Sequence, residues 1–192
     1  MGGPERLTHL DASFLYLERA SMPMHAGGVS ILDPSTRPDG RLPFEDVRRM
    51  LAARIHLAPR LRQRVLEVPL GIARPVWVDD ERFDLDFHLR RAALPAPGGR
   101  AELADAVGRA LSEPLDRTRP LWELYLFEGL EGGLAAALLK VHHAMADGVS
   151  VMRVAQAMFD LDPEPRDPGE PEPWRPAPPP TAAGLLGDAL LQ

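Results

Sequence analysis

An apolar run that ends in two adjacent histidines is the feature that most constrains this chain. Residues 134–141 read Leu-Ala-Ala-Ala-Leu-Leu-Lys-Val, and His142 and His143 follow directly. A short apolar run bounded by turn residues is typical of a buried strand, and the pattern over residues 149–161 predicts a helix. We therefore expect the two histidines at the end of a strand.

Strand geometry separates the two histidines from each other. Successive residues of a strand point to opposite faces, so extended geometry would place His143 on the face of Val141 and His142 on the face of Lys140. A given cleft should then receive only one of them. An imidazole has an unperturbed pKa of about 6.5 and is suited to general-base work near neutral pH.

Asp147 and Gly148 follow at the point where the strand would turn into the helix. The carboxylate of Asp147 could cap the helix, orient the turn or pair with an arginine from elsewhere, and capping is a common role for Asp at a helix start. Gly148 would supply the backbone freedom that a tight turn needs. The histidines are also open to a structural interpretation, as hydrogen-bonded interior residues. A metal site is disfavoured, because adjacent histidines on opposite faces chelate poorly and no third ligand lies nearby.

Composition limits the proteins to which this stretch can belong. A chain of 192 residues has room for one domain with a core, at roughly 100–200 residues per domain. The net charge is -6 and basic residues are mixed with acidic ones, which argues against a nucleic-acid partner.

The absence of cysteine excludes disulfides, thiolate nucleophiles and cysteine-bound metals. Lys140 is the only lysine, which we attribute to the base composition of the genome. No run approaches the ~18 apolar residues of a membrane-spanning helix, so we expect a cytoplasmic protein.

Hydrophobic periodicity predicts alternating helices and strands. Helical spacing predicts a short helix from about Asp11 and amphipathic helices between Pro43 and Pro59 and over residues 103–111. Strand-like runs occupy residues 24–32, 61–68, 75–78, 87–92 and 121–127. A glycine-rich turn joins the last of these to residues 134–141, which predicts an antiparallel hairpin.

The character of the chain changes after residue 161. Residues 162–180 contain nine prolines, so we expect an extended, exposed linker there. Residues 181–192 begin an apolar helix with nothing in the chain to pack on. We therefore divide the chain into an N-terminal lobe (1–161), a linker (162–180) and the start of a helix (181–192) that leads to a second lobe beyond this sequence. The apolar stripe of this helix fits either a lipid interface or a lobe interface; it consists of Leu185, Leu186, Ala189 and Leu190.

The residues from His142 to Gly148 match the HHxxxDG motif of the CoA-dependent acyltransferase superfamily. Further segments resemble one branch of it, the bacterial wax ester synthase/diacylglycerol acyltransferases. They are Leu-Asp-Ala-Ser-Phe-Leu at 10–15, Pro-Met-His-Ala-Gly-Gly at 23–28 and Pro-Leu-Asp-Arg-Thr-Arg-Pro-Leu-Trp-Glu at 114–123. Together with the motif they span most of residues 7–160 in the order that the family shows.

The resemblance implies an α/β fold of the chloramphenicol-acetyltransferase type, a two-layer sandwich with a mixed or antiparallel sheet and flanking helices. It makes this chain half of a two-lobed enzyme. It also implies that His143 is the general base, that His142 is a supporting neighbour and that Asp147 and Gly148 hold the turn of the motif. A possible wall of the acyl or CoA tunnel would be formed by Pro120, Leu121 and Trp122, whose apolar character fits plain core packing equally well.

The activity that the resemblance implies is transfer of a fatty acyl group from acyl-CoA to a hydroxyl. The acceptor would be diacylglycerol, giving triacylglycerol, or a long-chain alcohol, giving a wax ester. His143 would take the hydroxyl proton as the oxygen attacks the thioester, with no covalent enzyme intermediate. A Gly-x-Ser-x-Gly elbow, which would indicate a serine acyl-enzyme, does not occur in the sequence.

We expect no bound cofactor and no metal, with acyl-CoA as a co-substrate. The expected partners are the C-terminal lobe of the same protein and the surface of the inner membrane or of lipid droplets, and nucleic acid is not among them. Two alternatives stay open. Instead of a lipid acyltransferase, the chain could be a catalytically incomplete lobe that serves as a binding or assembly module, or it could be part of an enzyme that transfers acyl groups to a small non-lipid acceptor.

Overall fold

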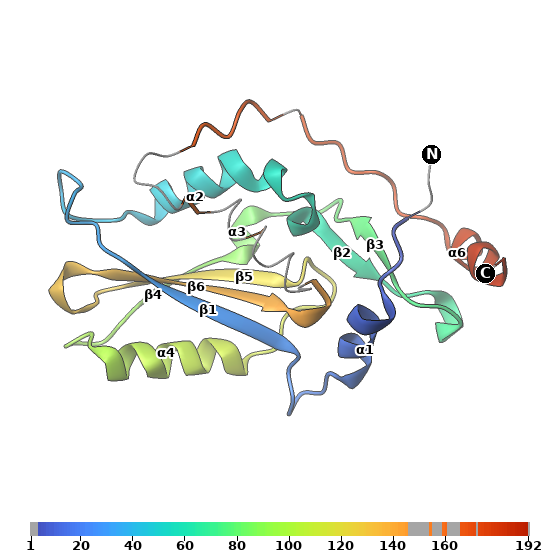
Figure 1. Ribbon diagram of the computed structural model, residues 1–192, viewed down its shortest axis with the longest axis horizontal. Helices are drawn as coiled ribbons and strands as arrows, with labels where there is room; N and C mark the ends of the chain where they lie inside the picture. The colour runs from blue at the N-terminus through green and yellow to red at the C-terminus, as the bar shows by residue number, and fades with distance from the viewer. Residues whose placement is uncertain (1–3, 146–153, 155–158, 161–165, 172, 192) are drawn as a thin grey trace.

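A four-stranded mixed sheet forms the centre of the protein (Figure 1). The computed structural model describes residues 4–145, 154, 159–160, 166–171 and 173–191. The strands follow the order β1-β6-β5-β4, and they are β1 (His25–Leu32), β6 (Ala135–His142), β5 (Trp122–Glu128) and β4 (Leu89–Ala93). β6 pairs antiparallel with β1 and with β5, and β4 runs parallel to β5. The hairpin predicted from the glycine-rich turn is therefore confirmed.

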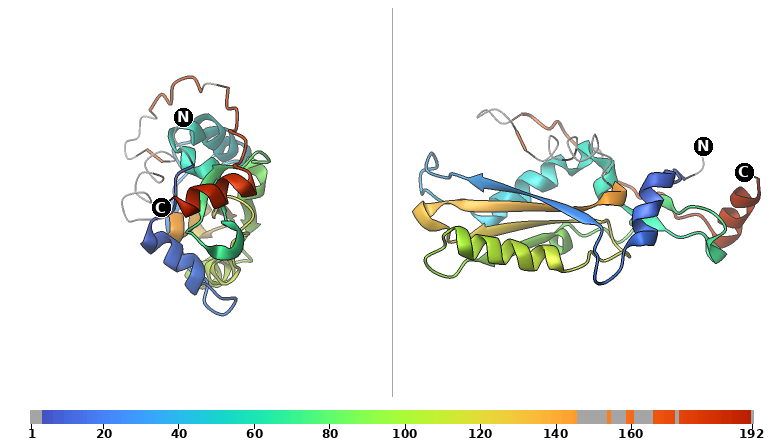
Figure 2. Two further views of the ribbon diagram at one scale, coloured as in Figure 1. Left: turned by 90° about the vertical axis from the view of Figure 1, so that its right-hand side faces the viewer. Right: turned by 60° about the horizontal axis from the view of Figure 1, so that its bottom comes forward.

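Helices cover both faces of this sheet (Figures 1 and 2). α2 (Phe44–Arg54) lies over one face, where its residues Val47 and Leu51 share a core with Leu124. α4 (Arg100–Ser112) lies over the other face, where Ala106 and Ala110 pack against Phe127. Each helix buries one apolar stripe, and the strands alternate between the two cores. The expected α/β class, with a mixed sheet and flanking helices, is confirmed.

α1 (His9–Leu17) lies beside the end of β6 that carries the histidines (Figure 1). The helix begins two residues before the predicted start at Asp11. The cause is a cap: the side-chain oxygen of Thr8 accepts a hydrogen bond from the backbone N–H of Asp11.

The remaining elements are short. β2 (Gln63–Leu66) and β3 (Val76–Asp79) form a separate antiparallel hairpin. The other elements are η1 (Ile55–Leu57), η2 (Pro59–Arg62), η3 (Pro69–Gly71), α3 (Leu85–His88), η4 (Glu131–Gly133) and η5 (His143–Met145). The strand predicted over 87–92 is wrong in its first two residues, which belong to α3. Asp84 caps this turn by accepting a hydrogen bond from the N–H of Asp86.

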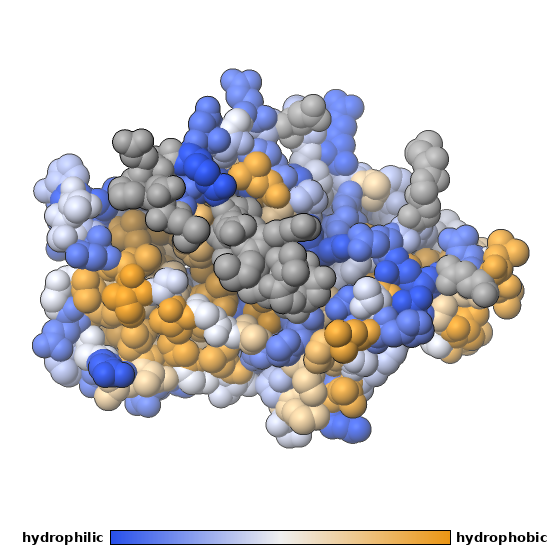
Figure 3. All heavy atoms as spheres, viewed as in Figure 1, coloured by the Kyte–Doolittle hydropathy of each residue, from blue (hydrophilic) through white to orange (hydrophobic). Residues whose placement is uncertain are grey.

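The C-terminal segment runs back along the molecule to α6 (Ala182–Leu190) (Figures 1 and 3). The described residues before it are extended (Figure 1). α6 packs on the β2–β3 hairpin, where Leu185 is buried with Val76 and Val78. The expectation that this helix has nothing in the chain to pack on is therefore wrong, because the hairpin exposes an apolar face that the helix covers.

The helix predicted over 149–161 lies outside the described residues except at Val154, Phe159 and Asp160. Within the part of the chain that the structure describes, no helix is long and apolar enough to cross a membrane.

Candidate active site

The two histidines stand at the junction of β6 and η5. His142 is the last residue of β6 and lies opposite His25 of β1. His25 bonds through Nε2 to the carbonyl of Leu111 in α4, over 2.7 Å. Side chains directly opposite one another share a face, so His142 lies on the α4 face with Lys140, as the alternation predicts. His143 starts η5, and its position is therefore set by the turn rather than by strand alternation.

His142 is fully buried and neutral. Its Nδ1 accepts a hydrogen bond from the backbone N–H of Ala144 over 2.9 Å, so the proton of the neutral ring sits on Nε2. Nε2 lies 3.3 Å from Oε1 of Glu18, although the atoms lack hydrogen-bond alignment. Burial lowers the pKa of His142 to about 4, and the carboxylate of Glu18 only partly opposes that effect. This ring is therefore uncharged at neutral pH, with its single proton on Nε2, and it holds the turn.

His143 is partly exposed and differs from its neighbour in every contact. Its backbone N–H donates to the carbonyl of Met24 over 2.8 Å. Its ring stacks on the ring of Phe14 in α1, with centroids 5.0 Å apart and planes inclined by 27°. An imidazole that is oriented by stacking and still reachable from solvent is the arrangement that a general base needs.

Two further residues of the motif are Asp147 and Gly148. Asp147 and Gly148 are outside the described residues, so their predicted role in the turn stays a prediction. Among the residues that the structure does describe, no group of three or more His, Cys, Asp and Glu side chains is arranged to hold a metal.

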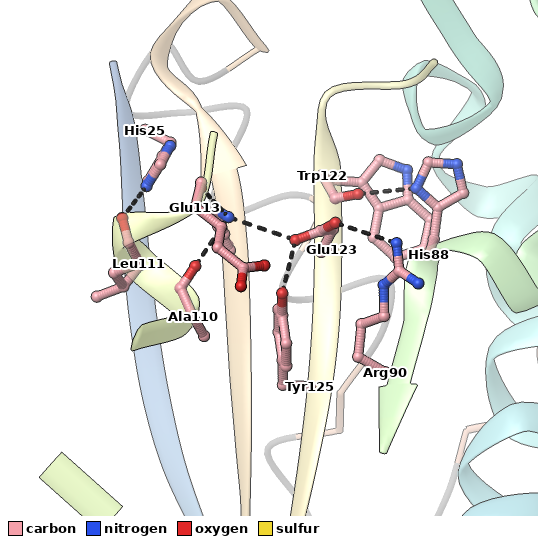
Figure 4. Close-up of polar contacts among 10 residues, drawn as sticks. His25, His88, Arg90, Ala110, Leu111, Glu113, Trp122, Glu123 and Tyr125 are labelled. Carbon is pink, nitrogen blue, oxygen red and sulfur yellow. Dashed lines mark hydrogen bonds and ion pairs between the residues drawn. The ribbon is translucent and has the colours of Figure 1, made fainter. Parts of the chain in front are cut away.

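The three predicted tunnel residues, Pro120, Leu121 and Trp122, are all buried. The indole N–H of Trp122 donates to the carbonyl of Leu61 over 2.8 Å. The ring of His88 stacks on the indole of Trp122, with ring centroids 4.5 Å apart. Nδ1 of His88 lies 2.7 Å from the carbonyl oxygen of Trp122 (Figure 4). Burial lowers the pKa of His88, so this neighbour is also neutral. These contacts are those of core packing, and a role in a tunnel stays a prediction.

A buried ammonium group, not predicted from the sequence, lies behind the histidines. Lys140 is fully buried in β6, and its Nζ donates to the carbonyls of Ala110 at 2.9 Å and Glu113 at 2.5 Å. These carbonyls end α4, where a helix leaves acceptors unpaired and favours positive charge. Nζ also lies 3.4 Å from the carboxylate of Glu123. Genome composition therefore does not explain this lysine, and a lone lysine inside an apolar strand was the available signal.

Glu123 connects this ammonium group to the neighbouring strands (Figure 4). Its carboxylate accepts a hydrogen bond from the hydroxyl of Tyr125 over 3.0 Å and lies 3.5 Å from the guanidinium of Arg90. Burial and the nearby Glu123 charge raise the pKa of the Tyr125 phenol. The result is a polar layer between α4 and the sheet, on the same face as His142, that is buried at Lys140 and Glu123 and partly exposed at Tyr125 and Arg90.

The chain is similar in sequence to one family of known proteins. The family model described as the wax ester synthase/diacylglycerol acyltransferase catalytic domain matches residues 7–190. The Mycobacterium tuberculosis protein Rv3087, assigned by name to the diacylglycerol O-acyltransferases, is 44% identical over 185 residues, which are 96% of this chain and 39% of that protein. A second protein of that organism with such a name, Tgs3, is 42% identical over 97% of this chain and 69% of its own length.

A solved structure of the same family and one of a condensation domain superpose on this chain. The wax ester synthase/diacylglycerol acyltransferase from Marinobacter aquaeolei VT8 superposes with a TM-score of 0.71 at 37% identity, over 88% of this chain and 39% of that one. The first condensation domain of the CDA synthetase superposes with a TM-score of 0.62 at 22% identity, over 82% and 40%, and shows a shared fold. The chain thus spans about two fifths of Rv3087 and of the Marinobacter protein.

Proposed function

This chain belongs to the wax ester synthase/diacylglycerol acyltransferase family, and we propose that it supplies half of a site that transfers a fatty acyl group from acyl-CoA to a hydroxyl. The observation that carries the proposal is the difference in burial and contacts between the two histidines. His142 is buried and neutral, whereas His143 is partly exposed and oriented by Phe14. One imidazole therefore holds the turn and the other is available to a substrate.

In the proposed reaction His143 acts as the general base. It takes the proton from the hydroxyl of diacylglycerol or of a long-chain alcohol while that oxygen attacks the thioester carbonyl. The new C–O bond and the loss of the C–S bond give the ester and free CoA, and the proton passes from His143 to the departing sulfur. Such proton transfer contributes about 10²–10⁴-fold to a rate.

The other motif residues support the base in this proposal. His142 anchors the turn through the N–H of Ala144, and Asp147 and Gly148 complete that turn. Pro120, Leu121 and Trp122 pack the floor beneath the strand, and their burial favours this role over a tunnel wall.

We propose that residues 1–161 form the N-terminal lobe and residues 162–180 the linker, and that residues 181–192 lead to a second lobe that completes the site. The greater length of the relatives supports this division. The proposed substrates are the acyl-CoA, as the CoA-bearing co-substrate, and the lipid acceptor.

We further propose a cytoplasmic protein that works at the surface of the inner membrane or of lipid droplets, because its acceptors are insoluble in water. The exposed Leu190 and Leu191 at the end of α6 suit such contact, and apolar atoms gather there (Figure 3). Flotation of the full-length protein with liposomes, with and without residues 181–192, tests this point; equal binding would remove the case for α6.

Product analysis tests the acceptor. The full-length protein is supplied with labelled long-chain acyl-CoA and equal concentrations of diacylglycerol, a long-chain alcohol and a small hydrophilic amine. We expect labelled triacylglycerol or wax ester. Label on the amine alone would favour a small-acceptor enzyme, and release of no CoA with any acceptor would favour a binding or assembly module.

A further inference from the structure

α1 and the residue that caps its C-terminus each present one side chain to a histidine of the motif. Phe14 and Glu18 are four residues apart, which places them on the same side of the helix. The ring of Phe14 stacks on His143 at 5.0 Å, and Oε1 of Glu18 lies 3.3 Å from Nε2 of His142. The last turn of α1 and its C-cap residue Glu18 therefore lie against both imidazoles.

Met24 closes this arrangement through its backbone. Its N–H donates to Oε1 of Glu18 over 3.1 Å, and its carbonyl accepts the N–H of His143 over 2.8 Å. The residue just before β1 is thus bonded both to Glu18 and to the start of the turn that carries the second histidine. Movement of the Glu18 carboxylate would be transmitted to the backbone of His143.

The burial of Glu18 needs an explanation. Its side chain is 9% exposed, and a carboxylate at this depth costs free energy unless it accepts hydrogen bonds. The N–H of Met24 supplies one donor. The protonated Nε2 of the neutral His142 ring lies 3.3 Å from the same oxygen, near enough for electrostatic attraction although the two atoms are not aligned for a hydrogen bond.

We propose that Glu18 is a positioning residue for the general base, holding His142 in the tautomer that carries its proton on Nε2. In that tautomer Nδ1 is free to accept the N–H of Ala144, and this bond fixes the turn on which His143 stands. The opposite tautomer would turn a lone pair toward the carboxylate and a proton toward the N–H of Ala144. The inference rests on the proposed function, since it assigns Glu18 a part in placing the proposed base.

Glu18 acts through His142, so its loss should affect the chemical step more than substrate binding. The test compares Glu18→Ala and Glu18→Gln in the full-length protein, with Glu45→Gln on the exposed side of α2 as control. We expect Glu18→Ala to lower kcat by about tenfold or more while KM for acyl-CoA changes less than about threefold, as for a misplaced catalytic group. Glu18→Gln should restore most of the activity, because its amide oxygen can accept from the N–H of Met24 and can occupy the place of Oε1 beside Nε2 of His142.

Histidine-selective ¹⁵N NMR gives a readout that does not depend on activity. In the wild-type protein His142 should show a protonated Nε2 and an unprotonated Nδ1. Glu18→Ala should mix the two tautomers, and Glu18→Gln should keep the first. Wild-type kcat in Glu18→Ala, equal impairment of the Ala and Gln variants, or an unchanged tautomer in Glu18→Ala would each overturn the proposal.

Two further variants separate this inference from the proposed function. If His143→Ala retains full turnover, the proposed function itself fails. If His143→Ala is inactive and Glu18→Ala is not, only the role of Glu18 fails. Phe14→Leu should lower kcat by removing the ring that orients His143, whereas the same change at Phe44, a partly buried residue of α2, should leave kcat unchanged.

Discussion

Ala144 donates its backbone N–H to Nδ1 of His142 over 2.9 Å, so a buried neutral ring closes the turn after β6. Burial lowers the pKa of His142 to about 4 in the folded protein, against about 6.5 in an unfolded chain. Between these values the unfolded chain binds more protons than the folded one. The contribution of His142 to stability is therefore complete above about pH 6.5 and is lost as the pH falls toward 4.

The first prediction is a steep acid dependence of stability that depends on this residue. From pH 7 to pH 4 the free energy of unfolding should fall by up to about 3 kcal/mol on account of His142. His142→Asn keeps an acceptor near the N–H of Ala144 but does not titrate, so its stability should fall less steeply. Urea unfolding of both proteins at several pH values measures this, and parallel curves would show that the ring does not titrate as described.

The second prediction concerns the ammonium group behind the motif. Lys140→Met should lower the free energy of unfolding by about 3 kcal/mol, because it leaves the last carbonyls of α4 and the carboxylate of Glu123 without their buried cation. Adding Glu123→Gln to Lys140→Met should recover part of the loss, since the carboxylate is then no longer charged. Denaturant unfolding is the measurement. A loss below about 0.5 kcal/mol in Lys140→Met, the range of ordinary surface changes, would refute the assignment.

The third prediction uses two adjacent glycines of β1. A Cβ on Gly27 would lie 2.7 Å from a methyl carbon of Leu111 and 2.8 Å from one of Leu138, whereas a Cβ on Gly28 meets nothing within 4 Å. Gly27→Ala should therefore lower stability by about 1–3 kcal/mol through overpacking between β1 and α4. Gly28→Ala is the matched control and should be nearly neutral. Equal thermal unfolding midpoints in the two variants would contradict the close approach of α4.

The fourth prediction distinguishes core packing from a tunnel at Trp122. Trp122→Phe removes the hydrogen bond to the carbonyl of Leu61 and part of a fully buried ring, so it should lower stability by about 2 kcal/mol. The preference among acyl-CoA chain lengths should stay unchanged. A shift in that preference with stability retained would instead support a tunnel wall.

Much of the architecture could be predicted from the hydrophobic pattern of each element. α2, α4, β5 and β6 lie within a few residues of their predicted bounds, because each helix buries one apolar stripe and both strands, which are buried on both faces, are rich in apolar residues. The strand predicted over 87–92 was wrong at its start because the Asp84 cap, a local side-chain bond, overrode the apolar pattern.

The site was predictable only in part, because its contacts join distant segments. Phe14 and Glu18 precede the histidines by more than a hundred residues, and no local pattern links them. The partners of Lys140 come from α4 and β5 and were likewise hidden. The packing of α6 on the β2–β3 hairpin was missed for the same reason: a short hairpin gives no sequence sign of which face stays uncovered.

The role of His143 is the central claim, and kcat for acyl transfer in the full-length His143→Ala protein tests it most directly. His9→Ala, which changes an exposed histidine of α1, serves as the matched control. With saturating long-chain acyl-CoA and diacylglycerol, we predict that His143→Ala loses about 10²–10⁴-fold in kcat while remaining folded, and that the control keeps wild-type turnover. Turnover of His143→Ala equal to that of the wild-type protein would contradict the claim.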